Sequence, residues 1–405
     1  MALPTPTDRI ARPVTVLLID DQPIVAESVR RMLAGEPDIV FHYCQDPTKA
    51  LQTANEVQPT VILQDLVMPD IDGLMLVKFF RANKATRETP LIVLSSKEEP
   101  TIKAQAFASG ANDYLVKLPD KLEVVARIRH HSRGYVALLE RNAAYDRLAE
   151  TQRMLAAEIA GAARYVKSLL PERLTGAVDI DFEFVPSLDL GGDMFGYNWI
   201  DRDHLAVYLL DVSGHGVGSS LLAVSAANVL SSRSLPNVDF RVPGQVMTRL
   251  NDVFQMDRQD NKYFTIFYGV FSKTDRTLAY CNGGHPDALL FTGADAASAT
   301  LSKLTSTDTL IGMLPPGLEF TTETVPLGPY ARLLIYSDGV FEVENVAGGE
   351  MWQFPQFVGH LAALLPDDQL LGKRLLAHAR GLRAHELLAD DFSFVEIRFR
   401  PPEQP

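Results

Sequence analysis

Residues 207–216 read VYLLDVSGHG, an apolar run that ends in an aspartate and a glycine-rich turn. The pattern is typical of a buried β-strand that presents Asp211 where the strand ends. We expect three further acids in similar places, namely Asp193 in LGGDMF, Asp338 in LLIYSDGV and Asp390 in LLADDFSFVEI. Carboxylates on rigid elements suit hard divalent cations, which take oxygen ligands. Two ions that share a carboxylate can generate a hydroxide and hold a phosphoryl group, so the sequence predicts a two-metal hydrolytic site.

The residues around these acids predict the architecture of the second half of the chain. Strand-like segments dominate it, and two helical patterns lie between them, at about 218–232 and 243–257. Runs of strands with paired helices favour an α+β sandwich with helices outside the sheets. The strand-like segments are DIDFEFVPS, HLAVYLLDV, YFTIFYGVF, TLAYCNGG, ARLLIYSDGVFEV and FSFVEIRF.

The first half of the chain carries a second set of polar residues after apolar runs. These residues are Asp20 and Asp21 after VTVLLI, Asp65 after VILQ, Ser95 at the end of PLIVLS and Lys117 at the end of ANDYLVK. Helical patterns fill the gaps, and the alternation predicts a doubly wound parallel α/β sheet with its function at the carboxyl ends of the strands. Three carboxylates, a hydroxyl and an ammonium group there predict a Mg²⁺ and phosphoryl site. The alternative, that Asp20 and Asp21 only cap a helix, does not account for the other three residues.

Residues 14–133 resemble a two-component receiver domain, with its flavodoxin-like fold, on these five positions in order. The resemblance implies that a sensor histidine kinase donates a phosphoryl group to this domain. It also implies a role for each residue: Asp65 is the phosphoacceptor, Asp20 and Asp21 hold Mg²⁺ with Asp65 and the Val67 carbonyl, Ser95 and Lys117 contact the phosphoryl group, and Tyr114 is the aromatic switch. We expect residues 1–13 to be a flexible N-terminus.

Residues 134–170 predict a long helical connector. Between Lys121 and Leu170 there is no proline, and a narrow apolar stripe recurs at alternating spacings of three and four. Such a stripe is typical of a coiled coil, here a parallel homodimer. The alternative is an amphipathic helix that packs against its own domains. The stripe comprises Leu138, Arg141, Tyr145, Leu148, Gln152, Leu155, Ile159, Ala162, Val166 and Leu169, in which Arg141 and Gln152 are the polar positions.

Residues 171–400 resemble the SpoIIE-type branch of the metal-dependent PP2C serine/threonine phosphatases. The motifs that carry the resemblance are, in order, GGDMF, DVSGHGVGSSLL, FTIFYGVF, NGGHPDALL, GMLP, YSDGVFE and DDFSFVEIR. It implies that Asp211 bridges two Mn²⁺ or Mg²⁺ ions with help from the Val212 carbonyl, that Asp338 and Asp390 hold one ion, and that Asp193 supports the other. A metal-bound water is then the nucleophile. Asp391, next to a ligand position, is a weaker candidate.

Both resemblances together predict a response regulator. Phosphorylation of its receiver would control a phosphatase that acts on a phosphoserine or phosphothreonine protein, by family resemblance a STAS-type anti-sigma-factor antagonist. The alternative is a catalytically weak PP2C-fold adaptor module that binds and sequesters a regulatory partner. Intact acids at all four metal positions favour catalysis.

Composition limits the partners and the location of the protein. A formal net charge of −13 disfavours nucleic acid, which requires clustered Lys and Arg. The sequence offers neither a signal peptide nor a stretch that approaches a membrane span, so we expect a cytoplasmic protein with no membrane partner. Cys44 and Cys281 are far apart and lack CxxC spacing, so neither predicts a disulfide or a zinc site.

Overall fold

The computed structural model describes residues 13–401 except 70, 97, 118, 188, 306–307, 345–350, 365–370 and 384–387. The chain divides into two compact units, Met1–Arg153 and Met154–Pro405, and each is described by itself. Apart from Pro13, the expected flexible N-terminus lies outside the described residues.

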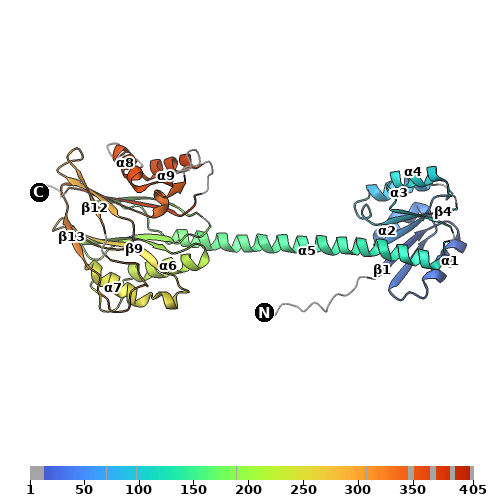
Figure 1. Ribbon diagram of the computed structural model, residues 1–405, viewed down its shortest axis with the longest axis horizontal. Helices are drawn as coiled ribbons and strands as arrows, with labels where there is room; N and C mark the ends of the chain where they lie inside the picture. Colours follow the sequence, from blue (N-terminus) through green and yellow to red (C-terminus); the bar gives the residue numbers. More distant parts are fainter. Residues whose placement is uncertain are drawn as a thin grey trace. The chain divides into compact units, whose positions relative to one another are not determined.

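The first unit contains a parallel five-stranded sheet with the order β2-β1-β3-β4-β5 (Figure 1). This is the flavodoxin-like order, so the predicted doubly wound fold is confirmed. The central strands are buried throughout most of their length because helices cover both faces of a parallel sheet. The strands are β1 (Val14–Ile19), β2 (Ile39–Cys44), β3 (Val61–Asp65), β4 (Leu91–Ser95) and β5 (Asp113–Val116), and the helices are α1 (Pro23–Leu33), α2 (Ala50–Val57), α3 (Gly73–Ala82) and α4 (Pro100–Ala108), with a 3₁₀ turn at Pro47–Lys49.

Helix α5 (Lys121–Ser168) runs for 48 residues and ends before Pro171, which cannot continue a helix. Its first turns pack on the receiver sheet through Val124, Val125 and Ile128, all buried. Ion pairs and hydrogen bonds reinforce this contact: Arg127 Nη1 lies 2.7 Å from Asp113 Oδ2, Arg129 Nη2 lies 2.8 Å from Glu36 Oε2, and Ser132 Oγ donates to Thr60 Oγ1 at 2.7 Å. The beginning of α5 is therefore part of the receiver unit.

The second unit is a sandwich of two five-stranded antiparallel sheets, ordered β13-β10-β9-β8-β7 and β12-β11-β14-β17-β6. Helices α6 and α7 cover the first sheet, and α8 and α9 cover the second (Figure 1). A third apolar cluster fills the space between the sheets. The helices are α6 (Val217–Ser231), α7 (Pro243–Val253), α8 (Phe354–Leu364) and α9 (Leu371–Leu382). The predicted α+β sandwich is confirmed.

The strands of this unit include several that the sequence reading did not identify. They are β6 (Val178–Val185), β7 (Asp193–Trp199), β8 (His204–Val212), β9 (Phe264–Ser272), β10 (Thr277–Gly283), β11 (Ala288–Gly293), β12 (Thr300–Leu304), β13 (Glu323–Pro326), β14 (Tyr330–Tyr336), β15 (Val343–Glu344), β16 (Met351–Trp352) and β17 (Phe392–Phe399), with 3₁₀ turns at Met256–Arg258 and Asp338–Val340. Strands β7, β11, β12, β13 and β16 were not predicted from the sequence. The sequence reading also treated 331–343 as one segment, whereas β14 ends at Tyr336 and a 3₁₀ turn follows.

Helices α8 and α9 were also missed, and they give the sandwich its second covered face. None of the helices that the structure describes is long and apolar enough to span a membrane.

Candidate functional site

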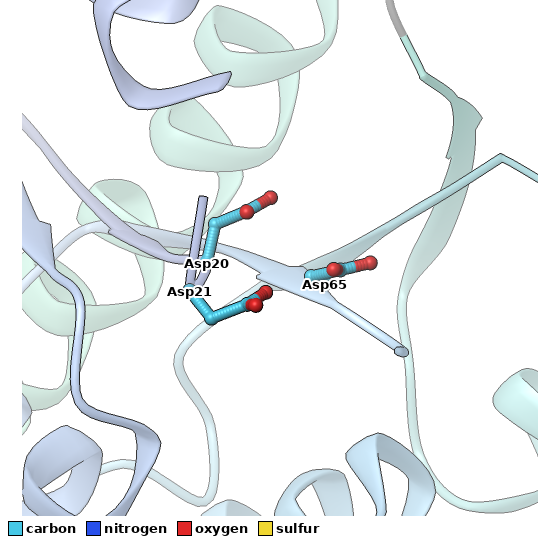
Figure 2. A group of neighbouring side chains, drawn as sticks. All are labelled: Asp20, Asp21 and Asp65. Carbon is cyan, nitrogen blue, oxygen red and sulfur yellow. The ribbon is translucent and has the colours of Figure 1, made fainter. Parts of the chain in front are cut away.

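Three acids meet at the carboxyl end of the receiver sheet. Asp20 and Asp21 follow β1, and Asp65 ends the neighbouring strand β3, so each supplies an oxygen within 4.8 Å of the others (Figure 2). Asp20 and Asp65 are 0% and 2% exposed. Asp21 Oδ1 is buried without a hydrogen-bond partner. Clustered, desolvated carboxylates with an unused oxygen fit a divalent cation.

Lys117 supplies a positive charge to this cluster. Its Nζ lies 2.8 Å from Asp20 Oδ2 and 2.8 Å from Asp65 Oδ2. Burial raises the pKa of Asp20, although its hydrogen bond from Lys117 opposes that shift. Burial lowers the pKa of Lys117, but its bonds to the two carboxylates outweigh burial and leave the pKa above its ordinary value. Lys117 therefore remains charged beside the predicted phosphoacceptor.

The other predicted receiver residues lie on or just after neighbouring strands of the same sheet. Ser95 ends β4 and is 1% exposed, and its carbonyl accepts a hydrogen bond from the Lys117 amide at 2.8 Å. Tyr114 is buried in β5, so its ring already lies inside the domain. Val67 is 61% exposed, just after β3. The fold thus brings together the five polar positions that the sequence places after strands.

In the second unit, Asp193 and Asp211 face each other across two antiparallel strands. Asp193 begins β7, Asp211 lies near the end of β8, and the two are register partners. Asp338 lies in the 3₁₀ turn after β14, and Asp390 precedes β17, which pairs with β14. Our expectation that all four acids follow strands was therefore wrong for Asp193 and Asp390. In an antiparallel sheet the beginning of one strand adjoins the end of the next, so Asp193 meets Asp211 in one sheet and Asp390 lies near Asp338 in the other. The two sheets bring these pairs together at one edge of the sandwich.

A cavity of about 730 Å³ opens at this edge. Asp211, Asp338 and Asp390 line it together with Val212, whereas Asp193 is 2% exposed and is not among its lining residues. The sequence reading missed the roles of the other lining residues, such as Ser187, Ser213, Tyr263 and Thr265, because hydroxyl groups in turns and strands have no distinctive spacing.

The acids of this cavity repel one another. Burial, together with Asp338 and Asp390, raises the pKa of Asp211 to about 8. Burial and Asp390 raise the pKa of Asp338 to about 6. Burial and Asp211 hold the pKa of Asp193 well above its ordinary value, and its Oδ2 is buried without a hydrogen-bond partner. Divalent cations would offset this repulsion, so these residues fit a metal centre.

Spacing distinguishes this centre from the receiver site. Within the described part of the chain, Asp20, Asp21 and Asp65 are the only three acids whose ligand atoms all lie within 4.8 Å of one another. The four acids of the second unit are therefore spread more widely than the three receiver acids.

Comparison with known families assigns both units. Residues 16–129 match the response regulator receiver domain, and residues 201–400 match the family described as Stage II sporulation protein E (SpoIIE). The chain joins a receiver domain to a SpoIIE-type PP2C domain. The two matched segments leave out most of α5, which connects them.

Individual relatives agree with this division. The chain is 31% identical over 176 residues to the phosphoserine phosphatase RsbP of Bacillus subtilis. The aligned segment covers 43% of this chain and 42% of RsbP. It is 33% identical over 116 residues to the DNA-binding transcriptional regulator RpaA of Synechocystis, which is 28% of this chain and 47% of RpaA. The chain thus spans less than half the length of these curated relatives.

A solved structure supports the fold of the second unit. The PP2C domain of SiaA from Pseudomonas aeruginosa superposes with a TM-score of 0.52 at 16% identity, covering 62% of this chain and 98% of that domain. Identity at this level shows the fold alone.

Proposed function

We propose that this chain is a response regulator whose output is a metal-dependent phosphoserine/phosphothreonine protein phosphatase. The observation that carries the proposal is the acidic cavity, in which Asp211, Asp338 and Asp390 converge above the buried Asp193. The match to the SpoIIE family over 201–400 and the similarity to a phosphoserine phosphatase support the same reaction.

The acids would divide the work of holding two Mn²⁺ or Mg²⁺ ions. Asp211 would bridge the ions with help from the Val212 carbonyl, Asp338 and Asp390 would hold one ion, and Asp193 would support the other. Such a pair of ions supplies a nucleophilic hydroxide and stabilises the charge of the phosphoryl group. The protein contributes rigidity, because pairing with β7 and β9 on either side holds the backbone of Asp211 in place.

The substrate we propose is a phosphorylated STAS-type anti-sigma-factor antagonist. Hydrolysis of p-nitrophenyl phosphate and of phosphoserine proteins, with and without Mn²⁺, tests the proposal. Metal-dependent turnover on the protein substrate is the expected result. Tight binding of that protein without turnover would instead favour the adaptor module.

The receiver would take its phosphoryl group from a sensor histidine kinase at Asp65, with Mg²⁺ held by Asp20 and Asp21. The convergence of the three acids with Lys117 supports this role. A small phosphodonor such as acetyl phosphate should label the protein only in the presence of Mg²⁺. Kinases of this type use ATP, so we also propose a cytoplasmic location.

The helical connector would dimerise and transmit the signal. We divide the chain into a receiver at 14–133, a connector at 134–170 and a phosphatase domain at 171–400. Tyr145, Leu148 and Leu155 are 64%, 54% and 61% exposed on α5, as a seam that awaits a second copy requires. Val166 packs instead against the core of the phosphatase unit, so the seam would end before it.

Contacts at the beginning of α5 support its role in signalling. Strand β5, which carries Tyr114 and precedes Lys117, is tied to α5 because Asp113 pairs with both Arg127 and His131. A receiver rearrangement that moves β5 would therefore move the beginning of the helix. A shift of about 1 Å at a catalytic ligand can cost ~10²-fold in rate, so a small helix movement suffices for control.

A further inference from the structure

Asp391 lies next to the proposed ligand Asp390, but hydrogen bonds from other residues of the protein already use the acceptor sites of its carboxylate. The residue is 5% exposed. Its Oδ1 accepts hydrogen bonds from the Ser187 amide at 2.8 Å and the Ser187 hydroxyl at 2.9 Å. Its Oδ2 accepts from the Gly192 amide at 2.6 Å and from the Asp193 amide at 3.4 Å. A carboxylate offers about four acceptor sites, so little capacity remains for a metal ion.

These bonds join segments that are far apart in the sequence. Ser187, Gly192 and Asp193 belong to the loop between β6 and the start of β7, whereas Asp391 precedes β17. The Asp391 side chain therefore connects the two sheets of the sandwich at the edge where the acidic cavity opens. Asp193 is bonded through its own amide, so the contact acts directly on the backbone of a proposed metal ligand.

The backbone of Asp391 connects the other two elements of the site. Its amide donates to Asp390 Oδ1 at 2.8 Å. Its carbonyl accepts from the Ser337 hydroxyl at 3.0 Å, and Ser337 directly precedes Asp338. Asp391 thus touches Asp193 and Asp390 and the neighbour of Asp338.

Two glycines leave room for this arrangement. A Cβ at Gly191 would overlap with the Asp391 carboxylate, and a Cβ at Gly339 would overlap with the Asp391 carbonyl. The loop before β7 therefore packs closely against the Asp391 side chain, and the 3₁₀ turn after β14 packs closely against its backbone.

We propose that Asp391 is a positioning residue for the metal centre: it holds the Asp193 loop and the Asp390 turn in the arrangement that binds the ions, without binding them itself. The inference rests on the proposed function. Residues that orient metal ligands typically cost ~10–100-fold in metal affinity or activity when they are changed. Loss of a residue of this kind lowers the affinity for the metal, whereas loss of a bridging ligand removes the reaction.

The test compares Mn²⁺ binding by calorimetry with turnover of p-nitrophenyl phosphate over a range of Mn²⁺ concentrations. It uses the full chain with Asp21→Asn/Asp65→Ala in every variant, so that the receiver acids do not contribute a second Mn²⁺ site. In Asp391→Asn, an amide NH₂ replaces an acceptor that faces backbone N–H groups. We expect Mn²⁺ to bind ~10–100-fold more weakly in this variant. Excess Mn²⁺ should restore most of its turnover.

A second variant, Gly191→Ala, distinguishes the effect of the Asp391 charge from the effect of the position of its carboxylate. Gly191→Ala keeps the negative charge of Asp391 but displaces its carboxylate, so it should weaken Mn²⁺ binding as well. Because both changes break the same contacts, the double variant should lose less affinity than the two single losses added together. Gly191→Ala also carries the test if Asp391→Asn fails to fold.

A matched control lies at the other end of β8. The Asp203 carboxylate also caps a loop, since it accepts from the Thr274 amide at 2.7 Å and the Ser272 hydroxyl at 3.0 Å. Asp203→Asn should leave Mn²⁺ affinity unchanged. Wild-type Mn²⁺ affinity in both Asp391→Asn and Gly191→Ala would overturn the inference, and so would a loss of turnover that no Mn²⁺ concentration restores. If the wild type bound Mn²⁺ but hydrolysed nothing, the proposed function would fail, while the metal-binding comparison would still decide the role of Asp391.

Discussion

The two acidic sites of this chain occupy sheet edges of opposite construction. In the receiver, the strands are parallel, so every carboxyl end lies at one edge, and the three acids, Ser95 and Lys117 lie at or just after the end of a strand. In the phosphatase unit the strands are antiparallel. Asp211 and Asp338 therefore lie near or after the end of a strand, whereas Asp193 and Asp390 lie at or before the beginning of one. The direction of the strands therefore decides whether a site can be read as a simple repeat along the sequence.

The two sites also differ in how they balance charge. Lys117 lies 2.8 Å from two of the three receiver acids. Across the described part of the chain, the structure records no ion pair between a Lys or Arg and the four phosphatase acids. The pKa of Asp211 reaches about 8 as a result of burial and its acidic neighbours. The receiver thus carries its own counter-charge, whereas the proposed metal ions would supply it to the phosphatase site.

The largest expected effect comes from the proposed bridging ligand. Asp211→Asn should lower Mn²⁺-dependent turnover by several orders of magnitude, because both the nucleophile and the clamp on the phosphoryl group depend on it. Initial rates at saturating Mn²⁺ measure the loss. Near-wild-type turnover would mean that the site has been assigned to the wrong residues.

The receiver site should break independently of the phosphatase site. Asp65→Ala removes the phosphoacceptor, so labelling by acetyl phosphate should disappear while basal phosphatase turnover is retained. Phos-tag electrophoresis and the p-nitrophenyl phosphate assay measure the two properties in one preparation. Label that persisted on Asp65→Ala would contradict the assignment of Asp65.

Coupling between the sites should depend on the connector. We expect beryllofluoride to raise turnover severalfold in the wild type. Leu148→Glu/Leu155→Glu places like charges in the proposed seam and should give a monomer without this response. Light scattering and turnover measure both properties. A strictly monomeric variant that responded fully would remove the coiled coil from the mechanism.

The smallest effect tests the difference in charge balance. The folded-state pKa of Asp211 is about 8, above its ordinary value of 3.8, so the metal-free fold must hold a proton that the unfolded chain has already lost. Stability should therefore fall as pH rises from about 4 to 8. With EDTA at pH 8, Asp211→Asn should therefore melt a few degrees higher than the wild type. In a domain of this size, each kcal/mol of added stability raises the melting temperature by about 2–4 °C.

The receiver provides the opposite expectation. Lys117→Met leaves the buried carboxylates of Asp20 and Asp65 without the cation that pairs with both, so it should lower the melting temperature. Calorimetry of both variants at pH 8 measures the two shifts. Shifts of the same sign would contradict the contrast between the two sites.

The sequence by itself determined the receiver sheet, the long helix α5 and the identity of the acids. These features depend on consecutive residues: apolar runs that end in a polar residue, a helical stretch without proline, and aspartates in glycine-rich turns. The edge strands β12 and β13 are mostly exposed, so they lack the apolar run that marks a buried strand, and they were missed. The helices α8 and α9 were missed as well.

Only the tertiary structure decided how the acids are used. The register that sets Asp193 opposite Asp211, and the bonds from Asp391 to Ser187 and Gly192, join residues from different strands and from both sheets. Asp390 and Asp391 are neighbours of the same type in the sequence, yet one lines the cavity and the other is occupied by backbone amides. Their difference arises from burial and from hydrogen bonds between distant segments, which form only when the sandwich closes.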